Sequence, residues 1–213
     1  MRPPLSPYIG VAIALGSMHQ KERAIAKPLR TALGATLVLA PGLDTDQFGT
    51  FTGEIPRAGS MLQAARTKAL AAMMRTGLPY GIGSEGSFGP HPQFPFVAVG
   101  TELMVFVDRH RGLEIHDVLR TPRTNFDSIE CRAGASIESF IATVKFPSHG
   151  LVVKSRHADG RTYLAKGIVE RAALENAIAA ASEISSDHVA IVWTDMSAHF
   201  NPTRMAIIRR LAR

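Results

Sequence analysis

The chain has 213 residues, 46% hydrophobic and 20% charged, with a formal net charge of +6, and we expect one globular domain over residues 1–213. A single cysteine, Cys131, excludes an intramolecular disulfide or a cysteine-rich zinc site and fits a reducing cytoplasm. No stretch reaches 18 uninterrupted apolar residues, so we expect no membrane-spanning segment.

The first elements predict an α/β fold. Residues 9–15, "IGVAIAL", are a continuous apolar run, typical of a strand buried on both faces. Residues 18–33 have helical apolar spacing, although Pro28 should kink or shorten this helix. A second strand follows at 35–41. A strand, a helix and a strand at this spacing indicate a βαβ unit, and therefore a mixed central sheet flanked by helices.

The rest of the chain continues the mixture of helices and strands. A long polar connection at 42–59 overlaps the start of a helix at about 58–76, and a glycine-rich strand follows at 79–86. Residues 94–119 predict an antiparallel meander with turns at Gly100 and at 109–112. The remaining expected elements are a helix at 133–144, a strand at 149–156, a helix at 167–184, a strand at 188–195 and a closing helix at 201–212.

The basic charge favours anionic partners. Part of it lies in the C-terminal "RMAIIRRLAR", where a solvated helix face is a better interpretation than a nucleic-acid patch. Few aromatic residues accompany the basic ones, so stacking on single strands has little support. We therefore expect a nucleotide or another phosphorylated small molecule as the partner, rather than nucleic acid.

A first candidate site is "LGSMHQKE" at 15–22. Where a strand is followed directly by a helix, the free backbone N–H groups of the first helical turn point to one place and can bind an anion there. Ser17 could cap or donate, and Lys21 adds a positive charge. The motif is neither a Walker sequence nor a dinucleotide fingerprint, and on its own a plain strand-to-helix turn is a better interpretation than an anion site.

A second candidate site is "LDTDQFGTFTGEIPR" at 43–57. Asp44, Asp46 and Glu54 are oxygen ligands of the kind that Mg²⁺ prefers, and Arg57 could pair with phosphate. The aspartates could equally make turns, and Glu54 could serve the dipole of the following helix.

A third candidate site is "YGIGSEGSFGPHPQFPF" at 80–96. Glu85 follows a buried strand, where a carboxylate must be solvated, paired or bound to a cation. The glycines around it predict a close approach of the backbone to a ligand, a phosphate or a metal. His91 lies in a rigid segment between two prolines.

The histidines offer a further set of candidates. His149 in "FPSHGLVVK" is more simply structural, while Asp195, His199, Asn201 and Arg204 in "TDMSAHFNPTR" could recognise a base or phosphate. A hydrogen-bond network around the last helix explains this second group equally well. A transition-metal site is an alternative that would need tertiary assembly of His91, His149, His157, His199 and Asp195.

Three segments together resemble a known superfamily. In "VAIALGSMHQKERAIAKPL" a strand runs into a short polar loop with a lysine and then a helix. The second segment is "GEIPRAGSMLQAARTKALAAMMRTGLPYGIGSEGSF". It contains an acidic residue, an alanine-rich helix with "KA", a helix stop at "TGLP" and a strand that carries a second acidic residue. The third segment, "MSAHFNPTRMAIIRRLA", contains serine, histidine and arginine before a terminal helix. These features are similar to the inosine-triphosphate pyrophosphatase-like superfamily, which includes Maf proteins and the non-canonical purine NTP phosphatases.

A second resemblance covers almost the whole chain. "LDTDQFGTFTGE", "SEGSFGPHP", "FPSHGL" and "DMSAHFNPTR" are similar, nearly as written, to motifs of an uncharacterised bacterial family. That family implies no established activity.

The superfamily resemblance implies an ITPase-like fold, a homodimer and a Mg²⁺-dependent or Mn²⁺-dependent nucleotide pyrophosphatase, or a related phosphohydrolase. Glu54 and Glu85 would be catalytic, and with Asp46 they would hold the metal. The expected substrate-binding and phosphate-binding residues are Ser17, Lys21, Arg57, Lys68, His91, His149, His199 and Arg204. The alternatives are a non-catalytic nucleotide or phosphometabolite binder and the histidine-assembled metal enzyme.

Overall fold

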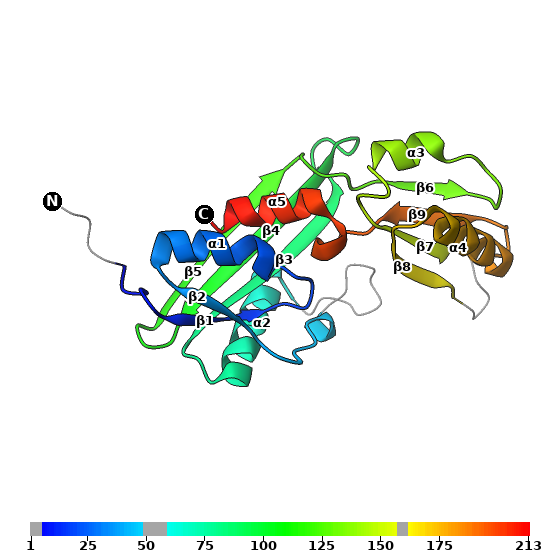
Figure 1. Ribbon diagram of the computed structural model, residues 1–213. Helices are drawn as coiled ribbons and strands as arrows, with labels where there is room; N and C mark the ends of the chain where they lie inside the picture. The colour runs from blue at the N-terminus through cyan, green and yellow to red at the C-terminus, as the bar shows by residue number, and fades with distance from the viewer. Residues whose placement is uncertain (1–5, 49–58, 157–161) are drawn as a thin grey trace. The chain divides into compact units, whose positions relative to one another are not determined.

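The computed structural model describes residues 6–48, 59–156 and 162–213 (Figure 1). The sequence predicted one domain, and the contacts divide the chain into two compact units. Unit 1 comprises Met1–Ser87, Gly100–Thr121 and Arg204–Arg213, and unit 2 comprises Phe88–Val99 and Pro122–Thr203. Each unit is built around a sheet of its own.

Unit 1 contains a mixed five-stranded sheet with the order β2-β1-β3-β4-β5. β1 pairs in parallel with both β2 and β3, whereas β4 and β5 are antiparallel, so the predicted mixed α/β sheet is confirmed. Its elements are β1 (Ala12–Gly16), α1 (Glu22–Leu33), β2 (Thr36–Leu39), the 3₁₀ helix η1 (Asp46–Phe48), α2 (Met61–Thr76) and β5 (Leu113–Thr121), with most of β3 (Tyr80–Pro90), β4 (Ala98–Asp108) and α5 (Pro202–Leu211).

Helix α2 packs against one face of this sheet. It begins with a capping box between Ser60 and Gln63, and ends at Gly77 in the left-handed conformation. Its buried side chains are mostly small alanines, which form a core with Ala14 of β1 and with Leu103, Val105 and Val107 of β4. Because side chains alternate along a strand, the odd-numbered positions of β4 face α2 and the even-numbered ones face the other way.

The glycines of β1 and β3 make room for the backbone of α2. A Cβ atom at Gly83 would overlap the carbonyl oxygen of Ala65 and lie 2.8 Å from the amide nitrogen of Ala69. Gly16 and Gly81 are similarly close to α2. The sequence predicted a ligand as the reason for the glycines around Glu85, and that was wrong for Gly81 and Gly83, because their close neighbour is a helix.

Unit 2 contains a four-stranded antiparallel sheet with the order β6-β9-β7-β8. Its elements are β6 (Ser128–Cys131), α3 (Glu138–Thr143), β7 (Leu151–Ser155), β8 (Leu164–Ile168), α4 (Arg171–Ile184), β9 (Ala190–Thr194) and the 3₁₀ helix η2 (Ala198–Phe200). Phe140 and Ile141 of α3 share one core with Leu174 and Ile178 of α4 and with the strands.

Several predicted boundaries were wrong. Gly100 lies within β4, and the turn is made earlier, where the His91 amide donates to the Val97 carbonyl at 2.7 Å. Helix α1 begins only at Glu22, after Gln20 with a φ of 56°, and continues through Pro28 to Leu33. Strands β6 and β8 were not predicted, and α3 occupies only the last part of the expected helix at 133–144. No helix among the described residues is long and apolar enough to cross a membrane.

The close approach of α2 leads to a stability prediction. We expect Gly83→Ala to lower the free energy of unfolding by about 3 kcal/mol, because backbone atoms of α2 leave no room for a methyl group. Gly89→Ala is the matched control, since a Cβ atom there meets nothing within 4 Å, and it should change stability by less than about 1 kcal/mol. Urea unfolding followed by circular dichroism measures both. Equal stability of the two variants would contradict the packing.

Candidate functional site

The candidate site lies where β1 ends in unit 1. After β1 the chain passes through α1 to β2 on one side, and then through α2 to β3 on the other side of β1. The carboxyl end of β1 is therefore the point where the direction of the connections reverses, and ligands of α/β sheets commonly bind at such a point. Gly16, the last residue of β1, is paired with Gly83 of β3.

β3 continues beyond this point and presents charged and polar side chains on both faces. Glu85 shares a face with Gly81 and Gly83, toward α2, and its Oε2 atom lies 2.5 Å from Nζ of Lys68. Both side chains are about nine-tenths buried. The ion pair therefore joins the strand to the middle of α2 and satisfies the carboxylate that the sequence predicted would need a partner.

Lys21 lies on the other face of β3, at the start of α1. Its ammonium group donates to the hydroxyl of Ser84 at 2.9 Å and to the Ser84 carbonyl at 3.3 Å, and the residue is only 5% exposed. Within the described residues no ion pair joins it to a carboxylate. Burial, followed by the positive charge of Arg204, lowers the pKa of Lys21 to about 7.

A second buried ion pair joins β4 to α5. Nε of Arg204 donates to Oε1 of Glu102 at 2.6 Å, and Glu102 is 1% exposed. Gly86 of β3 leaves room for this pair, because a Cβ atom there would meet the guanidinium group of Arg204. Glu102 was not predicted as a site residue. The one signal for it was a carboxylate in the interior of β4, directly before five apolar residues.

The buried charges at this end of the sheet do not balance. Among the described buried residues, Lys21, Lys68 and Arg204 provide three cations, whereas Glu85 and Glu102 provide two carboxylates. Each carboxylate is in an ion pair with a cation other than Lys21. An isolated buried charge is costly, so the arrangement is suited to an added anion.

The loop between β1 and α1 adds polar groups. Ser17 is 5% exposed, and its hydroxyl accepts a hydrogen bond from the His19 amide at 3.3 Å. The ring of His19 lies 3.1 Å from Asp46, measured from Nε2 to Oδ1, so Asp46 is placed over this loop. The structure thus brings the predicted residues Ser17, Lys21 and Asp46 to the same end of β1.

The described residues do not provide a preformed Mg²⁺ site. Among the predicted ligands, Asp46 contacts His19, Glu85 contacts Lys68, and Glu54 lies outside the described residues, as does Arg57. In the part of the chain that the structure describes, no three histidine, cysteine or acidic side chains are grouped to hold a metal ion. Asp44 accepts a hydrogen bond from the Asp46 amide at 2.9 Å, as expected of a turn residue.

The predicted histidines belong to unit 2, where two of them have structural contacts. Nδ1 of His91 accepts hydrogen bonds from the amides of Gln93 and Phe94 in the turn before β4. Nε2 of His149 lies 2.9 Å from the hydroxyl of Thr203, and burial lowers the pKa of this histidine. Neither side chain belongs to a group of metal ligands among the described residues.

The polar cluster before α5 is a hydrogen-bond network. The carboxylate of Asp195 accepts from the amides of Gly167 and Ser197, and the amide group of Asn201 donates to Asn125 at 2.8 Å. The ring of His199 packs on Phe200, with 4.1 Å between the ring centroids. These contacts fit the structural alternative for Asp195 and Asn201, while His157 lies outside the described residues.

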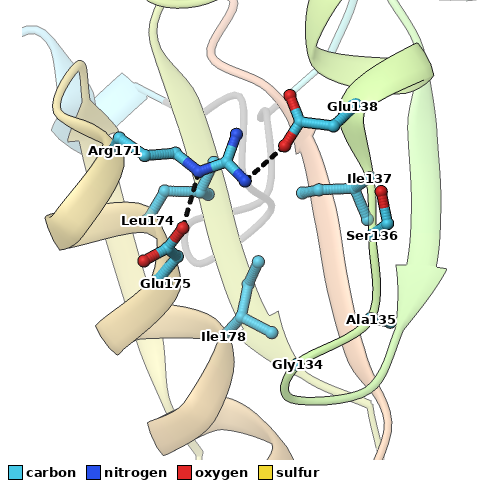
Figure 2. A pocket seen from close by; sticks show the side chains of 9 residues that line it. All are labelled: Gly134, Ala135, Ser136, Ile137, Glu138, Arg171, Leu174, Glu175 and Ile178. Carbon is cyan, nitrogen blue, oxygen red and sulfur yellow. Dashed lines mark hydrogen bonds and ion pairs between the residues drawn. The ribbon is translucent and has the colours of Figure 1, made fainter.

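Unit 2 also has a pocket of about 380 Å³ beside α4 (Figure 2). Arg171 crosses it and donates to Glu138 at 2.5 Å and to Glu175 at 2.7 Å, over the apolar side chains of Leu174 and Ile178. The lining has one arginine and two glutamates, so the pocket has no excess positive charge with which to attract an anion.

Comparison with known proteins shows the family. The model of a domain of unknown function, DUF6671, matches residues 68–213, which is more than half of the chain, and the chain belongs to this family. No curated protein and no solved structure gave a match. The expectation of an uncharacterised family is confirmed. Of the buried charges, Lys68, Glu85, Glu102 and Arg204 fall within the matched region, and Lys21 precedes it.

The buried position of Lys21 leads to a prediction about stability and pH. Its pKa in the folded state, about 7, lies below the ordinary value of 10.5, so the unfolded chain binds more protons between these values. The contribution of Lys21 to the free energy of unfolding therefore rises with pH through this window. We expect Lys21→Met to be more stable than the wild type at pH 7 by about 2–4 kcal/mol, with the difference shrinking toward pH 10.

Urea unfolding at pH 7, 8, 9 and 10 measures this difference. Lys27→Met removes an exposed lysine of the same helix and is the control, for which we expect a small and constant difference. A Lys21→Met variant that is less stable than the wild type at pH 7 would show that the buried ammonium is not a cost to folding.

Proposed function

We propose that this member of the DUF6671 family binds the phosphate groups of a nucleotide, or of another phosphorylated small molecule, at the carboxyl end of β1. The observation that carries the proposal is the buried ammonium group of Lys21, whose hydrogen bonds within the described residues go to Ser84, while the neighbouring carboxylates Glu85 and Glu102 are paired with other cations. A phosphate oxygen would supply the missing negative charge.

The charge balance explains why an anion would bind tightly there. Without a ligand, burial and the charge of Arg204 disfavour the protonated form of Lys21. A phosphate beside it would favour that form and would be attracted more strongly than at the surface, because the surroundings exclude water. The hydroxyl groups of Ser17 and Ser84 lie in the same buried region and could donate to the same phosphate.

The reaction that we propose is hydrolysis of a nucleoside triphosphate, with attack of water on the α-phosphorus and release of pyrophosphate. It is supported by the resemblance to the ITPase-like superfamily, whose fold we propose for unit 1. The segments that carry this resemblance contribute the lysine of the first loop, the lysine of the alanine-rich helix and the acidic residue of the strand. In the structure these are Lys21, Lys68 and Glu85, all around the end of β1.

Glu85 is the proposed catalytic carboxylate. Its ion pair with Lys68 fixes its position, and its carboxylate oxygens can accept a hydrogen bond from the attacking water. Lys68 is then a positioning residue that also attracts the substrate. The described carboxylates do not fit a preformed metal site, so Mg²⁺ or Mn²⁺ enters the proposal only as an ion supplied with the nucleotide in the assay.

Binding without turnover is the second candidate function. It is favoured by the two ion pairs, which occupy both buried carboxylates of the cluster. If Glu85 stays paired with Lys68, a phosphate can still bind nearby, but the carboxylate does not orient a water molecule for attack. The two candidates share the phosphate site and differ only in the role of Glu85.

The proposed site leads to a binding prediction. We expect nucleoside triphosphates to raise the melting temperature of the wild type, because a ligand at 100 times its Kd contributes about 2.7 kcal/mol. Lys21→Met should remove this shift, and the control Lys27→Met should retain it. A thermal-shift screen of nucleoside mono-, di- and triphosphates, with and without Mg²⁺, measures it. Equal shifts in the two variants would place the nucleotide elsewhere.

The proposed role of Glu85 leads to a prediction about turnover. We expect the wild type to release pyrophosphate from at least one nucleoside triphosphate, and Glu85→Gln to lose at least about 100-fold in rate, as is typical when a positioned acid–base group is removed. The variant should still show the nucleotide-dependent thermal shift. Binding without release of pyrophosphate by the wild type would establish the second candidate function instead.

A further inference from the structure

A groove between α1 and α5 in unit 1 is lined by cationic side chains. Its volume is about 570 Å³. Arg23 and Lys27 line it from α1, and Arg209 and Arg213 line it from α5 and the residues after it. The other lining residues are Pro28, Thr31 and Ala32, so no acidic side chain takes part.

These four cations have no ion-pair or side-chain hydrogen-bond partner in the part of the chain that the structure describes. All four are exposed, and none of the ion pairs or side-chain hydrogen bonds among the described residues involves them. Other exposed arginines of the protein, such as Arg66 and Arg171, do form ion pairs with glutamates. The groove is therefore a concentration of unneutralised positive charge, which attracts anions over a distance.

The helices arrange the charges in two rows. Arg23, Lys27 and Thr31 follow one another at intervals of four residues and so lie along one face of α1. In the second row Arg209 is part of α5, and Arg213 lies two residues after the end of that helix. The two cations of the row on α1, Arg23 and Lys27, are about 6 Å apart along the helix axis at 1.5 Å per residue. A nucleic-acid duplex carries about three to four phosphate charges over that length, which is close to the number of cations in the two rows.

The chemistry of the lining favours a phosphodiester backbone over a protein partner. Three of the four cations are arginines, whose planar guanidinium groups match phosphate oxygens. Protein interfaces depend on aromatic or large apolar anchors, and the groove lining contains none. Phosphate groups are the same in every base sequence, so contacts that these cations make with the backbone alone carry no sequence information.

We infer that this groove binds the phosphate backbone of double-stranded nucleic acid, in a manner independent of base sequence. The inference goes beyond the proposed nucleotide site, and neither depends on the other. The sequence argued against nucleic acid because a solvated helix face explained the C-terminal basic run better and few aromatic residues accompany the basic ones. The fold adds a second cationic row from α1, which lies nearly two hundred residues earlier in the chain.

The test is fluorescence anisotropy with a labelled 20-base-pair DNA duplex of mixed sequence, between 50 and 200 mM salt. With four phosphate contacts, log K should fall against log salt with a slope of about −3.6. We expect the double variant Lys27→Gln/Arg209→Gln to bind at least tenfold more weakly at 50 mM salt. Its slope should be shallower by about 1.8, because two contacts are lost.

The matched control is Arg30→Gln/Arg210→Gln. It removes the same charge from the same two helices, but these exposed residues do not line the groove, and we expect less than threefold weakening. Equal weakening of the two double variants would mean that net charge alone attracts the duplex, and would overturn the inference. Absence of binding at 50 mM salt would overturn it as well, as would competition by polyglutamate as effective as that by unlabelled duplex.

The nucleotide-dependent thermal shift of Lys27→Gln/Arg209→Gln separates this inference from the proposed function. We expect that shift to be unchanged, because the substituted side chains lie on the exposed face of α1 and α5, whereas Lys21 is buried. Loss of duplex binding with a retained nucleotide shift is the result that supports the inference. If this variant still binds the duplex as the wild type does, the inference is overturned, regardless of its nucleotide-dependent thermal shift.

Discussion

The close packing of α2 on β1 and β3 is the constraint on which the candidate site depends. Gly16, Gly81 and Gly83 leave no side chain between the strands and the helix, so the backbone of α2 lies against the sheet. At that depth a lysine in the middle of α2 reaches the carboxylate of Glu85, which follows the glycines on the same face of β3. A larger side chain at Gly83 would move the helix outward and separate Lys68 from Glu85. The glycines therefore fix the position of the charges, although they contact no ligand in our interpretation.

The alternation of side chains along β3 and β4 then determines which charged groups meet on each face of the sheet. Glu85 faces α2, while Ser84 faces Lys21, and Gly86 leaves room for Arg204 to reach Glu102. Buried ion pairs contribute little to stability, because the loss of hydration offsets their attraction. Apolar side chains of the same size would stabilise the fold at least as well. A cluster of five buried charged groups with one excess cation is therefore better explained by a ligand than by folding, as is common for perturbed groups in functional sites.

Sequence patterns predicted the parallel part of the fold because its signals are local. The apolar run of β1, the helical spacing of α1 and the glycine after α2 each depend on neighbouring residues. β6 has four residues, and β8 contains a lysine and a glycine, so neither shows a clear strand pattern. Lys21, Lys68 and Glu85 were predicted as site residues, but Glu102 was not. Its ion-pair partner Arg204 is 102 residues away in the sequence, so no local pattern connects the two. The glycines could not reveal whether a helix or a ligand was their neighbour, since both require the same absence of a side chain.

The two cationic regions of unit 1 should bind anions in physically different ways, although α1 contributes to both. Lys21 is at the buried start of the helix, and Arg23 and Lys27 are on its exposed face. At Lys21 water is excluded, so salt screens the interaction weakly, and a proton must be taken up when an anion binds above pH 7. In the groove the charges are exposed and dominated by arginines, which remain protonated at any physiological pH. Binding at Lys21 should therefore depend on pH more than on salt, and binding in the groove should depend on salt more than on pH.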